Sequence, residues 1–323
     1  MSDLLLRIIR SIIYRWNLEQ SVLSFLLKQS KNHSDESRKQ EALFNYIKQT
    51  VQDNTIRKDL LLDLLIEVAD KNRKTSQMPQ LTALSNDFVG YSIIANGYHE
   101  KELLEFLGEK VYPKLKKGIA LDIGAFIGTH SVHMAKYFNS VISFEPNPVV
   151  YKLLEANVAD SASKNIFTYN FGLSGEEQVL TYYKYKDGNL GRNKFVPAGE
   201  LVEDTFVKVG DLIVKSGEAA FKQISSERNI SLPISLIKID TEGHEISVLN
   251  GLKSVLTEHQ PVILFESLGI KDTTRIIEHL KSLGYSVFIE FNEHNPINPS
   301  RITTVQEKFY ALILASAYDI AIE

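Results

Sequence analysis

From about residue 118 onward, short apolar runs alternate with segments of helical periodicity, and this alternation constrains the fold of the 323-residue chain more than any other feature. The predicted strands lie at 118–123, 140–145, 165–171, 235–239, 261–265, 285–291 and 309–316. The predicted helices between them lie at 129–138, 148–159, 245–258 and 272–283. Strands separated by helices of this length favour a parallel sheet with helices on both faces. The sequence therefore predicts a doubly wound, mostly parallel α/β fold, in which ligands bind beyond the carboxyl ends of the strands.

The opening of the chain differs in character from the rest. Its first proline is Pro79 and its first glycine is Gly90, and the lack of both residue types favours helices joined by polar loops. We therefore expect a helical N-terminal extension over residues 1–80 and an α/β domain over residues 81–323. Within the second, residues 176–214 predict a β-rich insertion that could form part of a substrate wall.

Residues 3–27 predict an amphipathic helix, in which Arg7 and Arg10 lie opposite a face of leucine and isoleucine. A basic amphipathic helix can lie on an anionic membrane surface. The alternative, which we favour, is that its apolar face packs on neighbouring helices or on a second copy of the chain. Peripheral membrane contact and self-association both stay open at this point.

Composition excludes several classes of protein. The chain has no cysteine, which rules out disulfides, thiolate nucleophiles and cysteine-ligated metals. Its 36 basic and 40 acidic side chains disfavour nucleic-acid binding, which needs a basic surplus. Arginines interrupt the apolar N-terminus, and no uncharged run reaches the roughly 18–20 residues that cross a bilayer. We expect a cytoplasmic protein, and peripheral contact with a membrane stays an open alternative.

The segment 121–129 (LDIGAFIGT) ends the first predicted strand and opens the next helix. Its glycines, Gly124 and Gly128, allow a sharp turn and a close approach to a ligand. Glu145 ends the following strand, 23 residues after Asp122, where a carboxylate can hold both hydroxyls of a ribose. The loop lacks the G-x-G of nicotinamide-binding folds and the Gly-Lys of phosphate-binding loops. A ribose ligand with an ammonium group and no phosphate fits better, and S-adenosylmethionine (SAM) is such a molecule.

A second cluster of polar residues follows the strand predicted at 235–239. The segment 237–245 (IKIDTEGHE) contains three carboxylates and a histidine within six residues, which is costly unless they are solvated, paired or functional. Glu266 ends the next strand and adds another carboxylate to the same rim of the sheet. Glu242 or Glu245 could instead be a charge at a helix N-terminus, and for Glu245 we favour that structural role. For Asp240, at the strand end, we favour a functional role.

Seven segments keep the order found in one known family and cover roughly residues 90–270. They are GYHE at 97–100, DIGAFIG at 122–128, FEPNP at 144–148, NV at 157–158, GDL at 210–212, KIDTEGHE at 238–245 and PVILFE at 261–266. In these segments the chain resembles the FkbM family of SAM-dependent methyltransferases, known for O-methylation of sugars and polyketides. It departs from the family at Phe126, where asparagine is frequent, and at His130, where an aromatic residue is common.

The resemblance implies a class I, Rossmann-like methyltransferase domain that binds SAM. Glu145 would hold the ribose hydroxyls, residues 170–172 would flank the adenine, and the glycine loop would line the methionine end. The complete set of expected cofactor-binding residues is Tyr98, Glu100, Asp122, Gly124, Ala125, Gly128, Thr129, His130, Glu145, Pro146, Asn147, Asn170, Phe171 and Gly172.

Methyl transfer from a sulfonium is an in-line displacement, so the enzyme must align the acceptor oxygen and accept its proton. Asp240 and His244 are the candidate bases: the first has the better-defined position and the second the better unperturbed pKa. Asp240, Glu242 and Glu266 could also bind Mg²⁺, which would lower the pKa of the acceptor hydroxyl.

The sequence thus favours a SAM-dependent O-methyltransferase acting on a hydroxyl of a saccharide or glycoconjugate. The alternatives are a methyltransferase for a lipid or polyketide hydroxyl, and a catalytically silent scaffold that keeps the methyltransferase fold. The expected partner is a small hydroxyl-bearing acceptor rather than a nucleic acid.

Overall fold

The computed structural model describes residues 80–84, 89–90, 92–93, 98–186, 194–197, 203–229, 231–267, 269–291, 297–306 and 310–322. The chain divides into two compact units, one of Met1–Met78 and Ala83–His99, the other of Pro79–Thr82 and Glu100–Glu323. The predicted amphipathic helix at residues 3–27 lies outside the described residues, so its membrane or subunit contact stays a prediction. Within the described ranges, no helix is long and apolar enough to cross a membrane.

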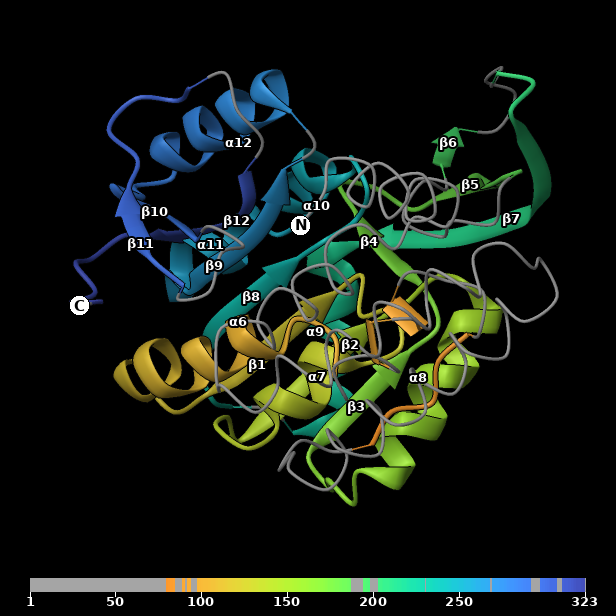
Figure 1. Ribbon diagram of the computed structural model, residues 1–323, viewed down its shortest axis with the longest axis horizontal. Coiled ribbons are helices and arrows are strands. Elements are labelled where there is room, and N and C mark those ends of the chain that lie inside the picture. Colours follow the sequence, from red (N-terminus) through yellow and green to blue (C-terminus); the bar gives the residue numbers. More distant parts are fainter. Residues whose placement is uncertain are drawn as a thin grey trace, which may run out of the picture. The chain divides into compact units, whose positions relative to one another are not determined.

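The second unit is built on a sheet of eight strands in the order β11-β10-β12-β9-β8-β1-β2-β3 (Figure 1). These strands are β1 (Ile119–Ile123), β2 (Ser140–Phe144), β3 (Ile166–Tyr169), β8 (Ile234–Ile239), β9 (Val262–Ser267), β10 (Val287–Phe291), β11 (Pro299–Arg301) and β12 (Tyr310–Ser316). Neighbouring strands from β3 to β9 are all parallel, whereas β12 is antiparallel to both β9 and β10. This confirms the predicted, mostly parallel α/β sheet of a class I methyltransferase fold.

The parallel part of the sheet is covered on both faces, and its central strands β1 and β8 are mostly apolar. All five residues of β1 and all six of β8 are buried, and buried residues form one cluster on each face. The helices that cover it are α6 (Lys101–Phe106), the π-helix η1 (Leu107–Val111), the 3-10 helix η2 (Tyr112–Lys114), α7 (Thr129–Met134), α8 (Pro148–Asp160), α9 (Gly217–Arg228), α10 (Glu245–Gly251), α11 (Lys253–His259) and α12 (Ile270–Ser282).

The two apolar clusters divide these helices between the faces. Side chains of α9, α10, α11 and α12 belong to one cluster, and those of η1, η2 and α7 belong to the other. This is the doubly wound arrangement, and it places the ends of β1, β2, β8 and β9 at one rim of the sheet. Glu145, Asp240 and Glu266 lie at or directly beside this rim.

Several elements differ from the sequence prediction: α7 ends at Met134 rather than at residue 138, and α9 and β11 were not predicted. The helix predicted over 245–258 is broken into α10 and α11 around Leu252. Gly251 packs so tightly that a Cβ there would lie 1.9 Å from the carbonyl oxygen of Ser174, so the chain turns at this contact. The strand predicted at 165–171 ends at Tyr169, and the chain then enters a second sheet at β4 (Gly172–Ser174).

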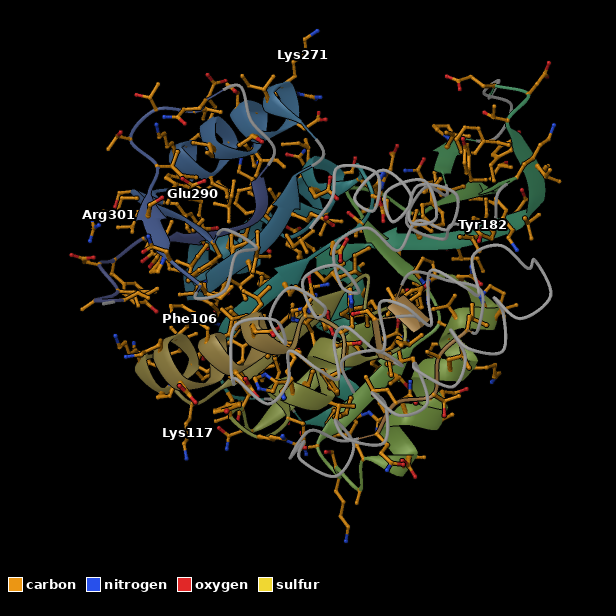
Figure 2. The ribbon with its side chains drawn as sticks, in the orientation of Figure 1. Phe106, Lys117, Tyr182, Lys271, Glu290 and Arg301 are labelled. Atoms are coloured by element: carbon orange, nitrogen blue, oxygen red, sulfur yellow. The ribbon has the colours of Figure 1, made fainter. Side chains whose placement is uncertain are left out.

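The second sheet has four strands in the order β4-β7-β5-β6, with β5 at Gln178–Tyr185, β6 at Lys194–Pro197 and β7 at Phe206–Ser216. It occupies most of the segment expected to be a β-rich insertion, and β5 to β7 lie at the upper right of Figure 1. Tyr182, labelled in Figure 2, stacks on Phe195 with the ring centroids 5.3 Å apart. The predicted domain boundary at residue 80 stays a prediction.

Candidate functional site

The loop between β1 and α7 is packed between the ends of β2 and β8. The backbone N–H groups of Gly124 and Ala125 both donate to the carbonyl oxygen of Phe144, at 3.0 and 2.9 Å. Gly124 has a φ of 80°, and a Cβ on it would lie 1.7 Å from the carbonyl oxygen of Asp240. A glycine is therefore required here both by the backbone conformation and by the close approach of the next strand end.

Gly128 completes the turn and leads into α7. It has a φ of 92° at the N-terminal cap of the helix, directly before Thr129, the first helical residue. Phe126, between the two glycines, also has a positive φ of 50°. A non-glycine residue in this region is strained, so the surrounding hydrogen bonds must hold the loop in place.

Glu145, directly after β2, provides one of those hydrogen bonds. Its carboxylate accepts the backbone N–H of Phe126 at 3.0 Å and that of Asn147 at 2.8 Å. Burial raises the pKa of Glu145 to about 8; the two N–H donors oppose the shift, and Asp240 and Asp122 add to it. With only 7% of its surface exposed, the carboxyl group has a fixed position beside the glycine loop.

The residues after Glu145 and those after β3 are tied together. The side-chain amide of Asn170 donates to the carbonyl oxygens of Glu145 at 2.8 Å and Pro146 at 3.2 Å. Asn147 accepts the N–H groups of α8 and so caps that helix. Phe171 packs 5.6 Å from Phe144 between ring centroids, just before Gly172. The segments predicted to contact ribose and adenine are therefore neighbours in the structure.

Asp122 lies beneath the glycine loop rather than on its surface. Its side chain is 0% exposed, and its Oδ2 accepts a hydrogen bond from Ser131 of α7 at 2.5 Å. The hydroxyl of Ser131 also lies 2.8 Å from that of Ser143 on β2. Through these hydrogen bonds Asp122 links β1 to α7 and β2. It therefore affects the residues at the rim only through the side chains that it contacts.

Lys238, on β8, is the residue of this site that the sequence analysis did not single out. Its ammonium nitrogen lies 3.0 Å from Oδ2 of Asp240 and 3.9 Å from Oδ1 of Asp122. Burial by itself would lower the pKa of Lys238, but Asp240, Asp122 and Glu100 outweigh it, and the pKa is raised. The signal was present in the sequence, because a lysine interrupts the otherwise apolar strand ISLIKI.

Asp240 and Glu266 form a carboxyl pair at the ends of β8 and β9. Burial opposes ionisation of Asp240, but Lys238 and a hydrogen bond with Glu266 lower its pKa overall. Burial raises the pKa of Glu266 to about 9, and the charge of Asp240 adds to the shift. Within this pair, Glu266 is the carboxyl group that favours the protonated form, and Asp240 is the one that favours the ionised form.

The predicted Mg²⁺ site at Asp240, Glu242 and Glu266 is not supported. In the part of the chain that the structure describes, no three histidine or acidic side chains are arranged to hold a metal ion. The physical reason is that Asp240 is already neutralised by Lys238, while Glu266 contributes a hydrogen bond to it. Burial also raises the pKa of Glu242 to about 8, which disfavours the ionised form that a metal requires.

The loop after Asp240 is held by Glu245. Its Oε1 accepts the N–H groups of Thr241 and Gly243, both at 3.1 Å, which agrees with a structural role at the start of α10. His244 lies at the N-terminal cap of that helix, with Nε2 3.0 Å from the hydroxyl of Ser174. Burial lowers the pKa of His244, so the imidazole is neutral at pH 7. Its role as a base stays a prediction.

Glu100 and His130 are brought together although 30 residues separate them. Nε2 of His130, in the first turn of α7, lies 2.8 Å from Oε2 of Glu100. Both residues were expected at the methionine end of the cofactor, and their contact joins α6 to the helix that follows the glycine loop. Tyr98 belongs to the other compact unit, and its contact with the cofactor stays a prediction.

Comparisons with known proteins identify the family. Residues 122–287, which are 166 of the 323 residues, match the methyltransferase FkbM domain. The hexuronic acid methyltransferase AglP of Haloferax volcanii is 29% identical over 162 residues, 50% of this chain and 61% of that protein's length. Methyltransferase 1 of Beauveria bassiana is 24% identical over 64% of this chain and 89% of its own.

A solved structure of an FkbM methyltransferase from Methylobacillus flagellatus has 14% sequence identity and a TM-score of 0.38, over 77% of this chain and 58% of its own. The family match covers the glycine loop, Glu145, Asp240 after β8 and Glu266 near the end of β9. It thus spans the whole rim of the sheet described above. The protein belongs to the FkbM family of methyltransferases.

Proposed function

We propose that the protein transfers a methyl group from SAM to a hydroxyl oxygen of a saccharide or glycoconjugate. The observation that carries the proposal is the buried, doubly hydrogen-bonded Glu145 beside the glycine loop, within the region that matches the family. The hexuronic acid methyltransferase among the relatives supports a sugar acceptor, although the match covers less than two thirds of that protein.

The side chains present fit the cofactor. Each oxygen of Glu145 accepts one backbone N–H, and the carboxyl group, mostly protonated at pH 7 with a pKa of about 8, can form a further hydrogen bond with a ribose hydroxyl. Gly124 and Gly128 leave no side chain between the loop backbone and a ligand. The Asn170–Phe171 turn, tied to Glu145 by the Asn170 amide, supplies an aromatic ring close to the expected position of the adenine.

SAM supplies an electrophilic methyl group on a sulfonium, and the oxygen of the acceptor displaces the thioether in line. The chain has to orient that oxygen and remove its proton. Asp240, ionised and fixed by Lys238, can accept a hydrogen bond from the acceptor hydroxyl. His244 is neutral at pH 7 and can take a proton. We assign the acceptor to the region between these two side chains.

The first test is calorimetric titration with SAM. Glu145→Ala should weaken SAM binding by about 100-fold or more, because it removes the carboxylate that holds the ribose hydroxyls and leaves two buried N–H groups without a partner. Glu155→Ala, which removes an exposed carboxylate of α8, is the matched control and should bind like the unaltered protein. Undiminished binding by Glu145→Ala would refute the assignment, and no binding by the unaltered protein would favour a silent scaffold.

The second test addresses the acceptor. The protein is incubated with SAM and either 4-nitrophenyl β-D-glucuronide, the matching glucoside or a long-chain alcohol, and the products are analysed by mass spectrometry and NMR. Methylation of a sugar hydroxyl is the expected result. Methylation of the alcohol alone would replace the saccharide with a lipid acceptor, and a methyl ester on the uronic acid would place the reaction at a carboxylate.

A further inference from the structure

A continuous line of polar side chains crosses the apolar sheet near its rim. Asp122 on β1 is directly opposite Ser143 on β2 and Lys238 on β8, so the three lie in one row. Hydrogen bonds and ion pairs extend the row through Ser131 at one end and Asp240 at the other. The row thus connects the helix after the glycine loop to the carboxyl pair at the ends of β8 and β9.

Lys238 is the cation of this row and is surrounded by acidic groups. The carboxyl groups of Glu100, Asp122, Asp240, Glu242 and Glu266 all interact electrostatically with it. The lysine lies inside a strand, and only 5% of its surface is exposed. Its ammonium group is therefore a fixed charge rather than a mobile surface group, and a buried ammonium of this kind persists only where partners compensate for lost hydration.

We propose that Lys238 is a positioning residue whose ammonium group takes the place that a divalent cation would have among the carboxylates at the ends of β1, β8 and β9. The inference rests on the proposed function, because it assigns Asp240 to the acceptor. Lys238 donates a hydrogen bond to Asp240, and Glu266 forms a second side-chain hydrogen bond with it. Asp240 is thereby kept ionised and in a single orientation toward the acceptor hydroxyl.

The alternative is that Lys238 only neutralises the fully buried Asp122 and stabilises the fold. The geometry favours Asp240, since the ammonium nitrogen is 3.0 Å from Asp240 and 3.9 Å from Asp122. The second distance exceeds that of a hydrogen bond. The two possibilities differ in what happens to Asp240 when the lysine is removed, and this can be measured without an acceptor or cofactor.

The experiment follows the carboxyl carbons of ¹³C-labelled aspartate and glutamate by NMR during a pH titration. The Asp240 signal is assigned by its loss in Asp240→Asn. Its midpoint should lie below that of a free aspartate in the unaltered protein and in Lys238→Arg, which keeps the charge. In Lys238→Met the midpoint should rise by at least about one pH unit, a tenfold change. The groups that also face Asp240 are Glu266 of β9, Glu242, Glu100 and Glu145. An unchanged midpoint would overturn the proposal.

If Lys238→Met fails to fold, the proposal is tested instead by a Mg²⁺ titration of the unaltered protein. After treatment with a chelator, it is titrated with MgCl₂ to millimolar concentration while the Asp240 and Glu266 carbons are observed. No saturable shift is expected, because the ammonium group already neutralises Asp240. A saturable shift of both carbons would show that a divalent cation binds there, and the proposal would be wrong. SAM calorimetry on the same sample separates either result from a failure of the proposed function.

A structural role is distinguished by kinetics once an acceptor is found. Lys238→Met should keep the Kd for SAM within about twofold while kcat falls by about tenfold or more, because cofactor binding depends on Glu145 and acceptor alignment on Asp240. Lys238→Arg should recover part of kcat. Equal kcat values for the unaltered protein and the methionine variant would contradict the proposal.

Discussion

The rim of the main sheet and the second sheet use β-structure in opposite ways. In the main sheet, β1 and β8 are buried along their whole length, and ionisable side chains occur at and near the strand ends. In the second sheet, β5 and β7 both leave large apolar side chains exposed to solvent. Those with about half or more of their surface exposed are Val179, Val207, Val209 and Ile213.

The difference shows where each region can place fixed charge. Buried parallel strands supply rigid positions from which a few carboxylates and a lysine interact at low local dielectric, so their pKa values shift strongly. The second sheet, in which only the pairing of β4 with β7 is parallel among the described strands, buries its side chains less and should tolerate substitution better. Function of the kind proposed therefore belongs to the rim, and sequence variation should be accommodated in the second sheet.

The largest expected effect is on Gly124. Gly124→Ala should lower the free energy of unfolding by at least about 3 kcal/mol, because the new Cβ would meet the carbonyl oxygen of Asp240 and the residue has a positive φ. The matched control is Gly210→Ala in β7, where a Cβ has no atom within 4 Å. It should change stability by no more than about 0.5 kcal/mol in urea unfolding. A similar loss in the free energy of unfolding for both variants would contradict this prediction.

The next effect is the dependence of stability on pH. Burial raises the pKa of Glu145 and Glu242 to about 8 and that of Glu266 to about 9. The folded protein thus binds more protons than the unfolded chain above pH 4.5, and stability is lost as the pH rises to about 9. We expect at least about 2 kcal/mol less stability at pH 9 than at pH 6, and Glu266→Gln should reduce the difference. Equal stability at both pH values would contradict these shifts.

The smallest effect compares two isoleucines. Ile237→Val in β8 removes a methyl group from a side chain that is 0% exposed and should cost about 1 kcal/mol. Ile213→Val in β7, where 52% of the side chain is exposed, should cost close to nothing. Chemical unfolding of both variants measures the difference. A clear loss for Ile213→Val would indicate that the exposed face of the second sheet is covered in solution.

The order of strands and helices in the main sheet could be predicted because parallel strands are short apolar runs with clear boundaries. The same runs placed Asp122, Glu145 and Asp240 at or near strand ends. The break after Gly251 was missed although an Asn-Gly pair there is a common helix terminus. The apolar runs do not reveal that β7 pairs with both β4 and β5, because this pairing depends on contacts between residues distant in sequence.

The chemistry of the rim could likewise be predicted only in part from the sequence. The sequence reveals which carboxylates share the rim but not which group neutralises them, and this is why Mg²⁺ was predicted where Lys238 lies. Only the register between β1 and β8 places Lys238 opposite Asp122. A charged residue inside an apolar strand is the signal that could have identified it, since such a residue needs a partner on the neighbouring strand.

The position of β12 has a consequence for how the molecule is assembled during synthesis. β12 follows β10 and β11 in the chain, yet it lies between β9 and β10 in the sheet. The parallel strands β1, β2, β3, β8 and β9 all precede β10 in the chain, so their neighbours in the sheet other than β12 are synthesised before β10. In contrast, β10 and β11 have no place in the sheet until residues 310–316 emerge. A nascent chain halted before residue 310 would carry every rim carboxylate, with β9 as an open edge.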